Sequence, residues 1–118
     1  MEKTAIQQQE SILIPHCHVA KSFFSRFFGL MGKKTLSTNE AILFPKCNSV
    51  HTFFMRFSID VIFVSADGHV VDIVEGMRPW RILLPRLQAK HTIEMRTERS
   101  RELRIGVGSK LDCKGVWT

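Results

Sequence analysis

Apolar residues along this chain recur mainly with the period of β-strands. Alternation of apolar and polar residues buries one face of a strand, whereas a short continuous apolar run is typical of a strand buried on both faces. With proline and glycine taken as boundaries, the sequence predicts strands over residues 11–15, 41–44, 51–63, 69–74, 91–95 and 111–117. The first is expected to be a short edge strand closed by Pro15, because proline donates no hydrogen bond to a ladder.

The stretch CNSVHTFFMRFSID, residues 47–60, carries the most varied side chains of the chain. From residue 51 to residue 63 the odd positions are nearly all apolar, while most even positions up to residue 60 are polar. This alternation predicts an extended segment with one buried face. Because so long a strand is unusual, we expect a bend or bulge near Phe57 and Ser58 that divides it into two segments.

Turn and helix signals complete the pattern. Asp67 and Gly68 separate two apolar runs and predict a hairpin with a type I′ turn, in which both central residues have positive φ. Phenylalanines at helical spacing predict an amphipathic helix over residues 21–31 that packs against the sheet. Thr97 is expected to cap a short helix that runs through Ile105.

Strands outnumber helices, and the two do not alternate along the chain. This order favours a mainly β (α+β) fold, a small antiparallel β-barrel or sandwich with one or two short covering helices. The length of 118 residues suits one domain. We expect that domain over residues 11–118, preceded by a polar N-terminus, residues 1–10, that is disordered or frayed.

The net charge, the cysteines and the lack of long apolar runs limit the kinds of partner and compartment expected for this chain. The net charge is +6, and its excess lies in the last third: residues 76–118 hold ten Lys/Arg against four Asp/Glu, while residues 1–75 hold seven of each. Three widely separated cysteines predict reduced thiols rather than a disulfide framework. No apolar run approaches the about 20 residues of a membrane-spanning helix, and the N-terminus lacks the pattern of a signal peptide, so we expect a cytoplasmic protein.

Five residues form the candidate ligand-binding face. Asp60 lies between apolar residues, where a carboxylate needs hydrogen-bond donors or a cation. It is either a structural clasp at the predicted bend or, with Arg56, part of a polar pocket wall that His51 and Thr52 border. Trp80 lies between two arginines and is expected to be a lid over one end of the barrel or a stacking platform.

The same region contains residues suited to metal binding or nucleophilic catalysis. His16, Cys17, His18, Cys47 and His51 are zinc-ligand types, but they form no paired-cysteine motif, so we expect no metal and no cofactor. A thiolate at Cys47, or at Cys17, with His51 as its base is the enzyme alternative, a hydrolase for which Cys47 and His51 are the first candidates. Nucleic acid is not an expected partner, because no stripe of aromatic and basic residues follows a strand.

Several motifs together resemble a known family. They are RFFGLMG at residues 26–32, CNSVHTFFMR at 47–56, IDVIF at 59–63, Asp67-Gly68, Pro79-Trp80-Arg81 and the late Gly108. Their order and spacing are similar to those of the bacterial and archaeal family called domain of unknown function 192. The resemblance implies a compact β-rich barrel or sandwich with a small helical decoration, and it implies no activity.

The sequence therefore predicts a binding module for a small molecule or a peptide. The expected site is the face formed by His51, Thr52, Arg56, Asp60 and Trp80. Whether the chain is an enzyme is left open by the residues, with a hydrolase that uses Cys47 and His51 as one alternative. An accessory protein of an envelope or secretion assembly is the other. The sequence does not specify an oligomeric state.

Overall fold

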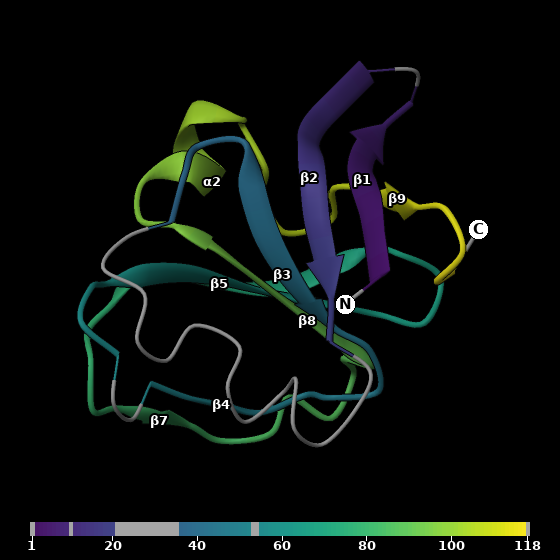
Figure 1. Cartoon of the computed structure of the whole chain (residues 1–118). Coiled ribbons are helices and arrows are strands. Elements are labelled where there is room, and N and C mark those ends of the chain that lie inside the picture. The colour runs from purple at the N-terminus through teal and green to yellow at the C-terminus, as the bar shows by residue number, and fades with distance from the viewer. Residues whose placement is uncertain (1, 10, 21–35, 53–54, 118) are drawn as a thin grey trace.

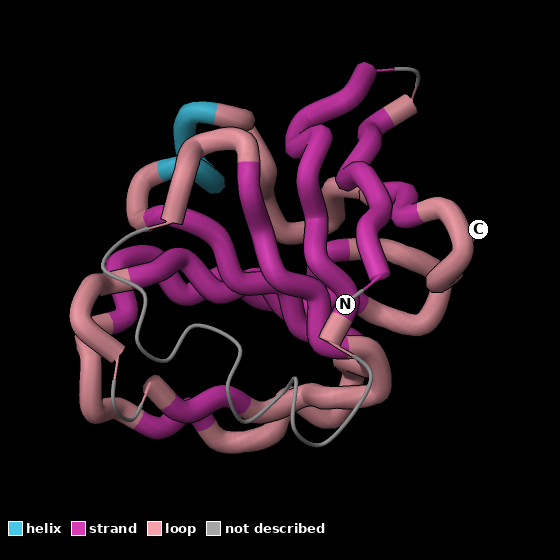
Figure 2. Tube along the Cα trace, in the orientation of Figure 1, coloured by secondary structure: helices cyan, strands magenta, loops and turns pink. Residues whose placement is uncertain are grey.

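The computed structural model describes residues 2–9, 11–20, 36–52 and 55–117. Strands make up 50% of the structure and helix 4%, and Figure 2 shows how strands dominate its regular elements. In chain order the elements are β1 (Glu2–Gln8), β2 (Ser11–Val19), β3 (Glu40–Phe44), β4 (Val50–His51), β5 (Ile59–Val64), β6 (Val70–Met77), β7 (Ile82–Leu83), β8 (His91–Arg96), α2 (Arg99–Glu102) and β9 (Asp112–Cys113).

One large sheet dominates the molecule. Its seven strands follow the order β6-β5-β8-β3-β2-β1-β9 and curl into a half-barrel, with the short helix α2 beside it (Figure 1). Neighbouring strands are antiparallel except β2 and β3, which are parallel. A second sheet of two strands, β4 and β7, lies along the lower edge of the molecule in Figure 1. The predicted mainly β fold with a short covering helix is confirmed.

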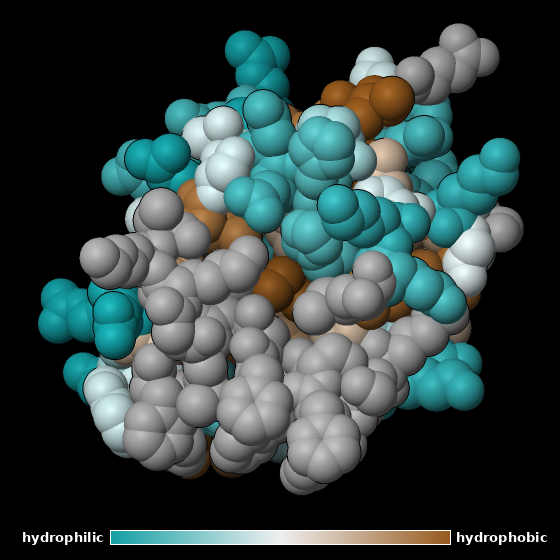
Figure 3. All heavy atoms as spheres, viewed as in Figure 1, coloured by the Kyte–Doolittle hydropathy of each residue, from teal (hydrophilic) through white to brown (hydrophobic). Residues whose placement is uncertain are grey.

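The large sheet carries a hydrophobic cluster on each face. Along β5, Ile62 and Val64 belong to one cluster, whereas Val61 and Phe63 belong to the other. All six β5 residues are buried, which explains the continuous apolar run at the end of the 51–63 segment. Outside these cores the described surface in the upper half of Figure 3 is mainly hydrophilic.

The described residues near the N-terminus form a paired strand, whereas the sequence predicts a frayed segment over residues 1–10. Glu2–Gln8 forms β1, which pairs with β2 on one side and with β9 on the other. Ile6 anchors this strand, because its side chain is fully buried in a core cluster. The polar residues around it lie on exposed or half-buried positions of the same strand.

Pro15 does not close β2, and β2 is not an edge strand, so both predictions are wrong. The strand runs through Pro15 to Val19 between β1 and β3. Two features of the register accommodate the missing N–H. The β1 pairing shifts between Thr4 and Ile6, opposite this position, and the β3 pairing begins one residue later, at His16. Proline is tolerated where a bulge leaves its nitrogen outside the ladder.

The 51–63 segment divides near its predicted bend. β4 ends at His51, residues 56 and 57 form a bend, and β5 begins at Ile59. The predicted alternation fails at β4, where His51 is exposed and Thr52 is buried. β4 pairs with β7 in the separate small sheet, so its faces do not continue those of β5.

The hairpin between β5 and β6 is confirmed, but its turn differs from the prediction. The Gly68 N–H donates to the Ser65 carbonyl, and positive φ occurs at Gly68 but not at Asp67. The connection is therefore a turn through residues 66 and 67 followed by a left-handed glycine, a common longer hairpin loop.

The remaining predictions concern the helices and the last strand. The predicted helix over residues 21–31 lies outside the described residues. The helix expected from Thr97 to Ile105 shortens to α2, whose N-cap is Glu98 in a left-handed conformation without a side-chain capping bond. The closing strand predicted over residues 111–117 reduces to β9, because residues 114–117 form a turn.

Candidate functional site

Thr52 holds the turn that connects β6 to β7. Its fully buried hydroxyl donates to the Arg78 carbonyl at 2.6 Å and accepts the Arg81 N–H at 2.9 Å. These two groups would bond each other in a closed β-turn. The hydroxyl therefore takes the place of that bond, and Thr52 acts as a structural clasp of this turn.

Trp80 sits at the tip of this turn in an unusual conformation. It has φ +62°, in the left-handed region that a bulky residue rarely adopts, and its side chain is 56% exposed. The Trp80 N–H donates to the Thr52 carbonyl at 2.9 Å, so the clasp also fixes this backbone. The Trp80 side chain is therefore presented at the surface by a backbone that its neighbours hold in place.

Asp60 is a buried clasp between three elements. One carboxylate oxygen accepts the N–H of Gly76, on β6, at 2.9 Å. The other accepts the Ser100 N–H at 3.1 Å and the Ser100 hydroxyl at 2.6 Å. Asp60 therefore supplies the acceptor that α2 lacks at its own N-cap, and its side chain is fully buried.

Gly76 explains why a carboxylate is needed on β5. The pairing of β5 with β6 shifts between Ile59 and Val61, so β6 forms a bulge at this point. Gly76 has φ +63°, a conformation that glycine adopts without the Cβ penalty. Its N–H turns out of the ladder toward Asp60, and the bond to the carboxylate satisfies it.

The structure places the five predicted site residues at different depths, and their role in ligand binding stays a prediction. Thr52 and Asp60 are buried and bonded to backbone, whereas His51, Arg56 and Trp80 are exposed. Among the described residues, the Asp60 carboxylate bonds to Gly76 and Ser100 rather than to Arg56.

The zinc-ligand types are also spread over the molecule. Cys17 is buried in the core, and burial raises the pKa of its thiol to about 12. His18 lies 3.4 Å from Glu40, and the Cys47 thiol donates to the Ser49 carbonyl at 3.2 Å. Within the described ranges, no three potential metal ligands come together.

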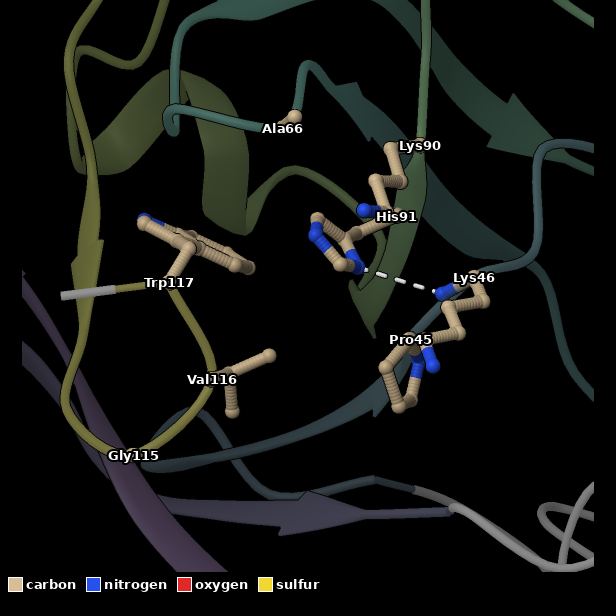
Figure 4. Close-up of a pocket in the computed structure, with 8 residues that line it drawn as sticks. All are labelled: Pro45, Lys46, Ala66, Lys90, His91, Gly115, Val116 and Trp117. Atoms are coloured by element: carbon tan, nitrogen blue, oxygen red, sulfur yellow. Dashed lines mark hydrogen bonds between the residues drawn. The ribbon is translucent and has the colours of Figure 1, made fainter.

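A pocket lies elsewhere, at the end of the large sheet where β3 ends and β8 begins. Its volume is about 400 Å³, within the usual range for small-molecule sites. Four separate segments line it (Figure 4): Pro45 and Lys46, Ala66, Lys90 and His91, and Gly115 to Trp117. We call this the His91 pocket.

His91 is a buried, neutral imidazole in this pocket. Burial, followed by the positive charges of Lys90 and Lys46, lowers its pKa below the usual 6.5. The backbone N–H of Lys46 donates to His91 Nδ1 at 3.2 Å, which places the ring proton on Nε2. Figure 4 shows Nε2 on the Trp117 side of the ring, so the pocket contains one imidazole donor.

Trp117 forms the opposite wall. Its ring stacks on His91 with centroids 5.0 Å apart, and its indole N–H donates to the Leu111 carbonyl at 2.7 Å. Gly68, with φ +96°, lies so close that an added Cβ would collide with both the indole nitrogen and that carbonyl. The hairpin glycine is thus required for the position of the pocket wall.

Sequence patterns missed this site because its residues are adjacent only through strand pairing. Phe44 pairs with Thr92 in the antiparallel β3 and β8 ladder. This register puts Lys46, just after β3, beside His91, at the start of β8. The available signal was a lysine just after one apolar run and a Lys-His pair just before another.

The architecture defines a small β-rich half-barrel domain with a basic-rimmed pocket at one end of its sheet. Residues 3–113 match the family model DUF192, described as "Uncharacterized ACR". The chain belongs to this family, which confirms the resemblance seen in its motifs.

Individual relatives agree with this assignment. A UPF0127 protein of Pyrococcus furiosus is 35% identical over 96 residues, which are 79% of this chain and 82% of that protein. A UPF0127 protein of Pyrococcus abyssi is 42% identical over 55 residues, 47% of this chain, and the match spans about half of that relative, 46% of its length. The crystal structure of a protein of unknown function from Novosphingobium aromaticivorans superposes with TM-score 0.79 at 19% identity, covering 93% of this chain and 83% of that one, which supports the fold.

Proposed function

We propose that this protein is a binding module for a small anionic molecule, which it takes up in the His91 pocket. The observation that carries the proposal is the combination of a pocket of about 400 Å³ with two lysines and a buried, neutral imidazole stacked on tryptophan. A carboxylate or a phosphate group is the expected anion, and a planar apolar part would lie along the Trp117 ring.

The chemistry of the lining supports an anion in particular. Lys46 and Lys90 are exposed cations at the pocket, and their charges already disfavour a proton on His91. A negative group would remove this repulsion. It would also accept the Nε2 proton of His91, since Nδ1 is occupied by the Lys46 backbone.

The alternative functions have less support from the described residues. A hydrolase that uses Cys47 and His51 remains a prediction, and the Cys47 thiol has a backbone carbonyl as its hydrogen-bond partner. An accessory role in an envelope or secretion assembly is likewise a prediction. Among the described residues, no helix has the length and hydropathy to cross a membrane.

An amide NMR titration with benzoate, inorganic phosphate and uncharged glucose as separate probes tests the proposal. Benzoate or phosphate should shift the signals of Lys46, Lys90 and His91 and the Trp117 indole, whereas glucose should not. The double substitution Lys46→Gln with Lys90→Gln should weaken the binding of either anion about tenfold, since each lost charge contributes up to about 1 kcal/mol to binding.

Lys3→Gln is the matched control, because Lys3 is an exposed lysine on β1 outside the pocket. The proposal is wrong if the shifts persist unchanged in the double variant. It is equally wrong if both anions leave the pocket signals in place.

A further inference from the structure

Four large apolar side chains lie exposed within eight residues of the β7 region. Trp80 is 56% exposed, and the values rise to 61%, 73% and 93% for Ile82, Leu84 and Leu87. We call these four residues the apolar strip. Isolated exposed leucines are ordinary, but several large exposed apolar side chains so close together in sequence are typical of an interaction surface.

The strip arises from the alternation of an extended chain. Ile82, on β7, and Leu84, just after it, are two residues apart and both exposed, while Leu83, between them, packs against a core cluster. A solvent-facing strand side normally carries polar residues. In the β7 segment, residues on both sides are apolar. This is unexpected, because β7 lies at the lower edge of the molecule (Figure 1), where one side faces solvent.

The backbone under the strip is held in place before any partner binds. Thr52 fixes its first end through the bonds to Arg78 and Arg81. Arg86 fixes its second end: its guanidinium bonds to Asp72 at 2.9 Å, and its backbone N–H donates to the Asn48 carbonyl at 3.0 Å. A rigid support lowers the entropy cost of placing the four side chains in an interface.

The segment that carries the strip contains basic side chains but no acidic ones. Between Glu75 and Glu94 the sequence contains no acidic residue and four basic ones, of which Arg86 is committed to Asp72. Arg78 and Arg81 are exposed at the Trp80 end. Cations beside exposed apolar side chains complement a surface that is negatively charged and apolar beneath.

We propose that the apolar strip inserts into the surface of an anionic lipid bilayer. Leu84 and Leu87 enter the acyl region, Trp80 lies at the headgroup level, and Arg78 and Arg81 contact lipid phosphates. A second copy of the chain fits less well, because symmetric pairing would bring the same arginines together. An acidic protein also fits less well. A side chain as exposed as Leu87 needs a deep matching pocket in a folded protein, whereas a fluid lipid bilayer accommodates it without one.

Vesicle flotation tests this proposal without reference to the His91 pocket. The full chain is mixed with vesicles of phosphatidylglycerol and phosphatidylcholine, or of phosphatidylcholine alone, in 0.15 M salt. We expect flotation with the anionic vesicles, at least tenfold less with the neutral ones, and at least tenfold less in the double variant Leu84→Glu with Leu87→Glu.

Val107→Glu is the matched control, because Val107 is an exposed apolar residue, 69% accessible, in a turn outside the strip. It adds negative charge without touching Leu84 or Leu87 and should retain at least half of the flotation. The proposal is overturned if the wild type does not float with anionic vesicles, if the double variant floats equally well, or if Val107→Glu abolishes flotation to the same degree. A dimer in sedimentation that the double variant dissolves would also overturn it, since the strip would then be a contact between copies.

Discussion

The His91 pocket and the apolar strip differ in how the chain builds them. Four segments far apart in sequence line the pocket, and its polar groups are fixed by bonds within the large sheet. The strip comes from one continuous segment, and its side chains point away from the protein. A concave site with fixed polar groups selects a small ligand by position, whereas a protruding apolar segment binds an extended surface by area.

The two regions also depend on different anchors. The pocket needs the hairpin glycine and the pairing of β3 with β8, while the strip needs the clasp of Thr52 on the small sheet. A substitution in one set of anchors should therefore leave the other region intact. Only a change in the large sheet, which carries the pocket and supports the strip through Asp72 on β6, should affect the two together.

Asp60→Ala is expected to have the largest effect, because it acts on the shared sheet. It removes three hydrogen bonds to a buried carboxylate and leaves the N–H groups of Gly76 and Ser100 without an acceptor. The free energy of unfolding should fall by about 3 kcal/mol, measured by urea denaturation. Asp112→Ala, which removes a half-buried carboxylate bonded to Lys110, should cost less than about 1 kcal/mol. Equal losses in the two variants would contradict the role of Asp60.

Thr52→Val should separate the two regions. The side chain keeps its shape but loses the hydroxyl, so the Arg78 carbonyl and Arg81 N–H lose their shared partner. We expect a loss of about 2 kcal/mol and a shift of the Trp80 indole signal, with the Trp117 indole unmoved. Thr97→Val, in the turn before α2, is the control and should move neither signal. A shift of Trp117 comparable to that of Trp80 would show that the regions are coupled.

The fold was predictable because strand patterns are local. Apolar runs, Asp67-Gly68 and the bend before Ile59 identified most of the large sheet, and they failed where pairing overrides local preference. Pro15 is an example: the residue signals a strand end, but a bulge on β2, where Pro15 and His16 lie opposite Ala5 of β1, and the late start of the β3 pairing let the strand continue.

The candidate site was less predictable, because function depends on which distant segments meet. The sequence marked Thr52 and Asp60 as polar residues that need partners, yet the partners of Asp60 lie up to 40 residues away. His91 was recognised only as the start of a strand. Its environment follows from the β3 and β8 register and from the position of the C-terminal turn, which no local pattern encodes.

Glu94→Gln, a change on the side of the sheet toward the strip, should alter how the free energy of unfolding depends on pH. Glu94 is buried on β8, and burial raises its pKa from 4.5 to about 8. The folded state therefore holds a proton that the unfolded state releases, so stability is lost as pH rises from about 4.5 to 8. Glu94 alone changes the free energy of unfolding by up to about 1.4 kcal/mol per pH unit. Denaturation from pH 5 to 8 should show a flatter profile in the variant. Glu98→Gln, at an exposed glutamate, serves as the control, and an unchanged slope in Glu94→Gln would refute the assignment.

His91 should give the smallest effect, with the opposite pH dependence to Glu94. Its folded pKa is lowered, so its contribution to stability is present above about pH 6.5 and is lost as pH falls toward the folded pKa. A bound anion would favour the imidazolium, and saturating benzoate should therefore raise the His91 pKa by about 0.5 unit, equivalent to about 0.7 kcal/mol. NMR titration of the imidazole protons measures both values, with exposed His69 as the internal control. The double variant Leu84→Glu with Leu87→Glu should show the same rise, because the strip lies outside the pocket lining. If benzoate leaves the His91 pKa unchanged while the pocket is otherwise intact, the anion does not bind beside the imidazole. Anion binding would then no longer distinguish the pocket from the strip.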